Sequence, residues 1–213
     1  SESTSWRKPS SYLLPSIEEA GPVEHALEHP TSPLRGVATT KFAFWLFLAS
    51  EAMFFAGLIA AYIVLRLASP SWPVVANVLN VPLVAFNTFI LIGSSVTMVM
   101  AFAAIEAGDQ GRLRRFLIAT AALGVIFLSI QAVEWRALIA EGTTASNSMF
   151  GSSFYTLTGF HGLHVLGGVV FLLYATAKAF QGRYTQQEHG GVELMGLYWH
   201  FVDVVWIFLF TIV

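Results

Sequence analysis

Two ionisable side chains lie three residues apart in the last apolar segment of the chain: His200 and Asp203, within the stretch YWHFVDVVW. Residues three apart share one face of a helix. An ionisable residue at membrane depth costs about 2.5–3.5 kcal/mol on insertion scales, so this pair needs partners on neighbouring segments. A metal site, a haem held between two histidines, or a proton relay could each use such residues.

Other ionisable residues lie at comparable depth in the remaining apolar segments. Glu51 stands well inside the first segment, His161 and His164 are one turn apart in the fourth, and Glu134 follows Gln131 near the end of the third. The second segment contributes neutral polar residues, namely Asn87, Ser94, Ser95 and Thr97. Several helices therefore direct polar groups towards the interior.

The spacing of these residues favours some of the three chemistries over others. Di-metal carboxylate bundles use Glu-x-x-His on two helices, whereas this chain has His161/His164 and His200/Asp203. Haem ligation by His164 and His200 stays open, while a relay needs titratable groups that cross the membrane. The simplest hypothesis is an interior polar network of Glu51, His164, His200 and Asp203, with each hydrogen bond contributing about 0.6–2 kcal/mol.

The composition indicates a bilayer environment. Hydrophobic residues make up 55% and charged residues 11% of the 213, and the mean hydropathy is +0.66. Each of five apolar runs is long enough to cross about 30 Å of hydrocarbon as a helix. We predict an all-α integral membrane bundle whose transmembrane helices cover about 41–66, 80–105, 113–140, 153–180 and 192–213.

The polar N-terminal segment, residues 1–38, is predicted to be separate from the transmembrane domain, residues 39–213. Its His25 and His29 are expected to be solvated. Thr39 and Thr40 are N-cap candidates for the first helix, and Pro82 suits the first turn of the second.

Basic residues predict the orientation. Nine of the eleven lie on one side of the predicted bundle: Arg7, Lys8, Arg35, Lys41, Arg112, Arg114, Arg115, Lys178 and Arg183. The opposite side carries Arg66 and Arg136. Because cytoplasmic loops are enriched in lysine and arginine, we expect a cytoplasmic N-terminus and a C-terminus outside.

The overall charge and the cysteine count exclude several classes. A net charge of −2 offers no basic face for nucleic acid, and the absence of cysteine excludes disulfides and thiolate metal sites. No internal repeat is evident, which weighs against a small transporter. A stand-alone bundle that binds haem or a metal through the buried histidines remains an alternative.

Four stretches resemble subunit III of the haem–copper oxidases, the cytochrome c and quinol oxidases that reduce dioxygen to water. They are SEAMFFAG (50–57), QAVEWR (131–136), FGSSFYTLTGFHGLHVLGG (150–168) and YWHFVDVVWIF (198–208). They fall in four of the five predicted helices, in order and at compatible spacing. The chain is similar to a five-helix bacterial form of this family.

The resemblance implies a non-catalytic core subunit that takes part in aerobic electron transport and is located in the bacterial plasma membrane. In this family, haem and copper belong to subunits I and II, where the electron donor, cytochrome c or quinol, also acts. Subunit III binds phospholipid and supports proton uptake and the durability of turnover. No catalytic, cofactor-binding or metal-binding residue is then expected in this chain.

The resemblance also assigns individual positions. Glu51 falls on the family's membrane-buried carboxylate, and the interior polar positions are Glu134, His161, His164, His200 and Asp203. Longer members have seven helices, of which this chain resembles the last five. Because the missing pair forms one wall of a lipid-filled cleft, lipid is expected in an open groove or against another subunit.

Overall fold

The computed structural model describes residues 33–75 and 78–213, with side chains from Thr39 onward in those ranges. The predictions for His25 and His29 fall outside the described residues. Five helices make up the fold: α1 (Pro33–Ala68), α2 (Val81–Glu106), α3 (Gln110–Ala140), α4 (Met149–Phe180) and α5 (Gly190–Ile212).

All five helices are long and apolar enough to cross a membrane, and the described residues contain no strand. The prediction of an all-α bundle with five transmembrane helices is therefore confirmed. The chain is a multi-pass membrane protein.

The helix ends follow local capping chemistry. Asn80 caps α2 by accepting a hydrogen bond from Leu83 N at 3.2 Å, and Pro82 lies in the first turn, as predicted. Asp109 caps α3 in the same way. The start of α1 was predicted wrongly: the helix begins at Pro33, so Thr39 and Thr40 lie inside it and are not N-caps. Hydropathy marks the entry into hydrocarbon, whereas a helix can begin earlier in water.

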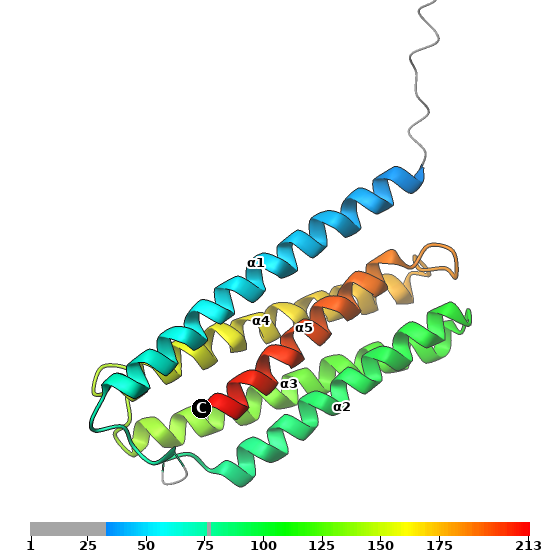
Figure 1. The fold of residues 1–213 in the computed structure, drawn as a ribbon. Coiled ribbons are helices and arrows are strands. Elements are labelled where there is room, and N and C mark those ends of the chain that lie inside the picture. Colours follow the sequence, from blue (N-terminus) through cyan, green and yellow to red (C-terminus); the bar gives the residue numbers. More distant parts are fainter. Residues whose placement is uncertain (1–32, 76–77) are drawn as a thin grey trace, which may run out of the picture.

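The helices form a closed ring with one helix outside it. Helix α2 packs against α3, α3 against α4, α4 against α5, and α5 against α2, while α1 packs against α4 and α5. Consecutive helices run antiparallel, and the N-terminal end of α1 extends beyond the ring (Figure 1).

Trp199 of α5 fills the centre of the ring. Its side chain is fully buried, and its indole N–H donates to Ser94 Oγ of α2 at 2.9 Å. A Cβ atom at Gly124 would lie 2.7 Å from this ring, and one at Gly168 would lie 2.8 Å from it. The two glycines therefore allow α3 and α4 to approach the indole.

Polar contacts hold α1 on the ring at positions between Lys41 and Arg66. Lys41 Nζ donates to Glu193 Oε1 at 2.8 Å near one end, and Arg66 donates to the Ile212 carbonyl oxygen at 2.8 Å near the other. Between them, Glu51 meets His164 of α4 at 2.9 Å. We refer to these as the α1 contacts.

Candidate polar sites in the helix bundle

The first site is the pair formed by Glu51 and His164. Glu51 Oε2 lies 2.9 Å from His164 Nε2, and His164 Nδ1 lies 2.7 Å from the carbonyl oxygen of Phe160. Because a carbonyl oxygen only accepts, Nδ1 must carry a proton. The bond at Nε2 then joins either imidazole to carboxylic acid or imidazolium to carboxylate. In both cases one proton lies between the two side chains.

This pair lies at the edge of the bundle. The side chains of His164 and Glu51 are 19% and 21% exposed, so lipid or another subunit can reach them. Phe55 packs its ring against the His164 ring, with centroids 4.9 Å apart. Tyr198 of α5 donates its hydroxyl to the His164 carbonyl oxygen at 3.0 Å. Elements α1, α4 and α5 thus fix the pair together.

The second site joins α5 to α2. His200 Nδ1 lies 2.6 Å from Ser95 Oγ. Asp203 is 5% exposed and lies beside the same serine, but neither of its carboxylate oxygens forms a hydrogen bond within the described part of the chain. The structure therefore pairs His200 with α2, and the four residues predicted to form one network divide into two groups.

The neutral polar residues of α2 form bonds to other helices. Asn87 donates to the Phe127 carbonyl oxygen of α3 at 3.2 Å, and Thr97 shares a 2.8 Å hydrogen bond with Thr120. Together with Ser94 and Ser95, they give α2 polar contacts with both neighbours in the ring.

His161 lies apart from His164, although only one turn separates them. Its side chain is 1% exposed and stacks on the Trp206 ring, with centroids 4.9 Å apart. Phe127 approaches its ring edge-on. Neither ring nitrogen has a hydrogen-bond partner among the residues that the structure describes. The i,i+3 spacing puts His164 towards α1 and His161 into the aromatic core.

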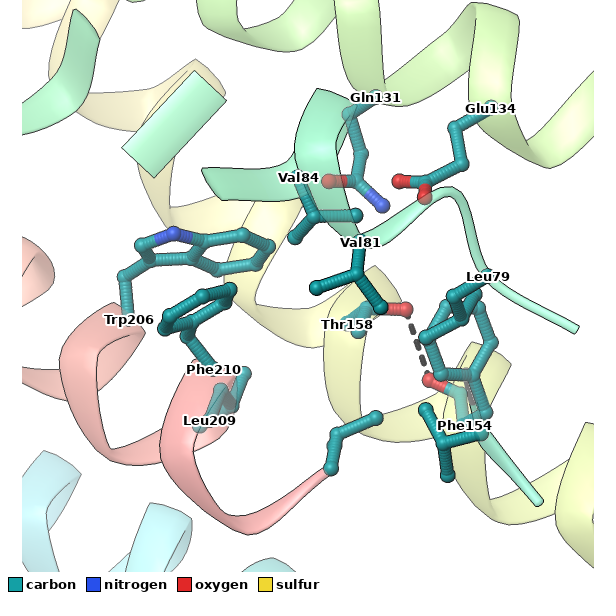
Figure 2. Close-up of a pocket in the computed structure, with 12 residues that line it drawn as sticks. Leu79, Val81, Val84, Gln131, Glu134, Phe154, Thr158, Trp206, Leu209 and Phe210 are labelled. Carbon is teal, nitrogen blue, oxygen red and sulfur yellow. Dashed lines mark hydrogen bonds between the residues drawn. The ribbon is translucent and has the colours of Figure 1, made fainter. Parts of the chain in front are cut away.

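Glu134 lies at a cavity that we call the Glu134 cavity. Its volume is about 230 Å³, and α2, α3, α4, α5 and the loop before α2 line it. Figure 2 shows Gln131 and Glu134 side by side on one wall, with their polar ends directed towards Val84 and Val81. Glu134 therefore lies apart from both the Glu51 pair and His200.

Aromatic side chains and Lys178 line a groove at the opposite end of the bundle, which the sequence did not predict. This aromatic groove has a volume of about 490 Å³. Its lining includes Phe44, Phe47, Phe171, Tyr174, Lys178, Tyr184 and Tyr198. Lys178 Nζ lies 4.6 Å from the centroid of the Tyr174 ring. The residues come from α1, the end of α4, the following loop and α5, so no single segment reveals the groove.

No group of three or more His, Asp or Glu side chains suited to a metal ion occurs within residues 33–75 and 78–213. His164 and His200, the two candidates for haem ligation, form hydrogen bonds to different helices, α1 and α2.

Comparison with known proteins identifies the family. The family described as Cytochrome c oxidase subunit III matches residues 28–213. A probable cytochrome c oxidase subunit 3 from Nocardia farcinica is 41% identical over 167 residues, which cover 78% of this chain and 82% of the relative. Cytochrome c oxidase subunit 3 from Thermostichus vulcanus is 38% identical over 191 residues, covering 89% and 90%. The Synechocystis protein of the same name is 44% identical over 187 residues, covering 87% and 76%.

The matched range, residues 28–213, includes all five helices that carry the polar sites. The chain belongs to the cytochrome c oxidase subunit III family.

Proposed function

We propose that this chain is the five-helix subunit III of a bacterial haem–copper terminal oxidase, and that it packs beside subunit I in the plasma membrane. The names of its relatives support this assignment. Haem and copper would then reside in subunits I and II, and this chain would contribute no redox centre of its own.

Within the complex, the chain supports proton uptake and the durability of turnover. The observation that carries this proposal is the Glu51–His164 pair, whose 2.9 Å contact holds one proton between two side chains. Because both groups are about one-fifth exposed, a neighbouring subunit can exchange a proton with them. A pair sealed inside the ring could not act in this way.

A bound phospholipid is the second part of the proposal. The Lys178 ammonium supplies a positive charge for a phosphate headgroup, and Phe44, Phe47 and Phe171 offer an apolar surface for acyl chains. Burial raises the pKa of the Tyr184 hydroxyl, although the Lys178 ammonium opposes the shift. The phenol therefore stays neutral at physiological pH and does not repel an anionic lipid.

One residue connects the groove to the Glu51–His164 pair. Tyr198 lines the aromatic groove and also donates to the His164 carbonyl oxygen at 3.0 Å. A lipid in the groove would thus lie against the residue that supports the pair. The charge bias supports a cytoplasmic position for this end of the bundle and for the N-terminus. Residues 39–213 would then form the membrane domain.

Replacement of Glu51 tests the proposed role. Glu51→Gln retains a hydrogen-bonding side chain but removes the titratable group. We expect the purified oxidase to keep its haem content, while its proton-to-electron ratio falls or its activity decays faster during turnover. Ser50→Ala is the matched control, because the Ser50 hydroxyl donates to Phe47 O of its own helix.

Two results would contradict the proposal. Unchanged pumping and unchanged inactivation in Glu51→Gln would remove the protonic role. If the chain, purified in mild detergent, brought down no haem- and copper-containing partner, the assignment as an oxidase subunit would fail.

A further inference from the structure

We propose that the Glu134 cavity binds a compact apolar molecule that carries a hydrogen-bond donor at one end. This inference goes beyond the oxidase role and rests on different residues. It concerns a cavity lined by the four ring helices and the loop before α2, and Glu51 and His164 are not part of its lining.

The walls of the cavity are almost entirely apolar. Val81, Val84, Leu209 and Phe210 line it, together with the loop residue Leu79. Figure 2 shows Trp206 and Phe210 on one side of the space and Phe154 on another. Such walls suit a hydrocarbon body, and the aromatic rings suit a flat one.

Two polar groups in the lining already have partners. The Thr158 hydroxyl donates to the Phe154 carbonyl oxygen at 2.7 Å, a bond drawn in Figure 2. The Trp206 indole N–H donates to Thr88 Oγ1 at 3.0 Å. Recognition of a ligand by hydrogen bonding is therefore left to Gln131 and Glu134.

These two side chains have unused acceptors. Glu134 is 5% exposed and Gln131 is 6% exposed. Glu134 Oε1 and Gln131 Oε1 are buried without a hydrogen-bond partner in the described part of the chain. A buried polar atom that lacks a partner costs about 1–3 kcal/mol. A molecule that supplies a donor to this wall would recover part of that cost.

The acceptors and the volume define the ligand class. A carboxyl group beside an amide oxygen favours a hydroxyl or an ammonium and disfavours an anion. An apolar cavity of roughly 150 Å³ is known to hold benzene. The Glu134 cavity, at about 230 Å³, has room for one ring with a short substituent.

The test uses the intact oxidase complex in mild detergent and three probes that share one ring. 4-Ethylphenol carries a hydroxyl donor, 4-ethylbenzylamine carries an ammonium, and 4-ethylanisole carries a methyl ether without a donor. Affinities are measured by saturation-transfer NMR titration. We expect at least one donor probe to bind saturably and about tenfold more tightly than 4-ethylanisole, which corresponds to about 1.4 kcal/mol. The tighter donor probe identifies the head group as hydroxyl or ammonium.

Variants locate the binding. Glu134→Leu should lower the affinity of the donor probe to that of 4-ethylanisole. The control is Glu141→Leu, which replaces an exposed glutamate at the end of α3 and should leave the affinity unchanged. Val84→Phe should exclude all three probes by filling the cavity.

Several outcomes would overturn the inference. It fails if neither donor probe binds saturably, or if 4-ethylanisole binds the wild-type complex as tightly as they do. It also fails if Glu134→Leu, recovered in normal yield, binds the donor probe like the wild type. The comparison of probes on the wild-type complex decides the question even if a variant does not fold.

Discussion

His200 Nδ1 of α5 lies 2.6 Å from Ser95 Oγ of α2, and this bond joins the first and last helices of the ring. The preceding residue of each helix supplies a second bond between the same elements, from Trp199 Nε1 to Ser94 Oγ. Two adjacent serines therefore engage two adjacent large side chains, and α2 and α5 are fixed both in rotation and in register.

Ser95→Ala should weaken the contact between α2 and α5. The substitution leaves a half-buried imidazole without its hydroxyl partner, and we expect a loss of about 1 kcal/mol, typical of interhelical hydrogen bonds in membranes. The measurement is the midpoint of thermal dissociation of this chain from the oxidase complex, which should fall. Ser129→Ala is the control, because the Ser129 hydroxyl bonds within α3. Equal midpoints for the two variants would contradict the prediction.

Gly168→Ala should disturb the packing around Trp199. The added methyl would lie 2.8 Å from one carbon of the indole and 2.9 Å from another, so the ring or α4 has to move. Overpacking of this kind costs about 1–3 kcal/mol. We expect a lower thermal midpoint and a lower yield of assembled complex.

Gly162, which lies in the same helix, provides a matched control for that substitution. A Cβ atom there meets nothing within 4 Å, so Gly162→Ala should be neutral or slightly stabilising. Combining Gly168→Ala with Trp199→Phe should cost less than the sum of the two single changes, because the smaller ring relieves the clash. Additive effects would show that the glycine and the indole do not interact.

Lys178→Gln should reduce the phospholipid retained by the complex. The change removes the positive charge over Tyr174 while keeping a polar side chain of similar reach. We expect less lipid phosphorus per haem after purification, measured by phosphate assay and lipid mass spectrometry. Arg112→Gln, which changes a cation paired with Asp109 at 3.3 Å, should leave the lipid content unchanged. Equal losses in the two variants would point to a general effect of charge.

Hydropathy was sufficient to predict the number of helices, and every predicted end except the start of α1 lies within about four residues of the observed one. It failed at the start of α1, because residues 33–38 continue the helix beyond the apolar stretch that the pattern detects. The prediction for Pro82, in the first turn of α2, is confirmed, whereas the N-cap Asn80 was not predicted.

The sequence did not predict which side chains contact one another across the helices. Spacing predicts that His200 and Asp203 share a face, but it does not indicate which helix lies opposite. Ser95, the partner of His200, is one of several small hydroxyl residues in α2, and nothing local distinguishes it. The Glu134 cavity presents the same difficulty, because its walls come from four helices and a loop.

The peripheral position of α1 has a consequence for how this architecture can change in size. Helices α2 to α5 close on one another, whereas α1 is attached to their outer surface by the α1 contacts and by the buried rings of Phe55 and Tyr62. Segments can therefore be gained or lost at the N-terminal edge without repacking Trp199 or opening the ring. A further helix could therefore pack beside α1 while the contacts among α2, α3, α4 and α5 stay as they are.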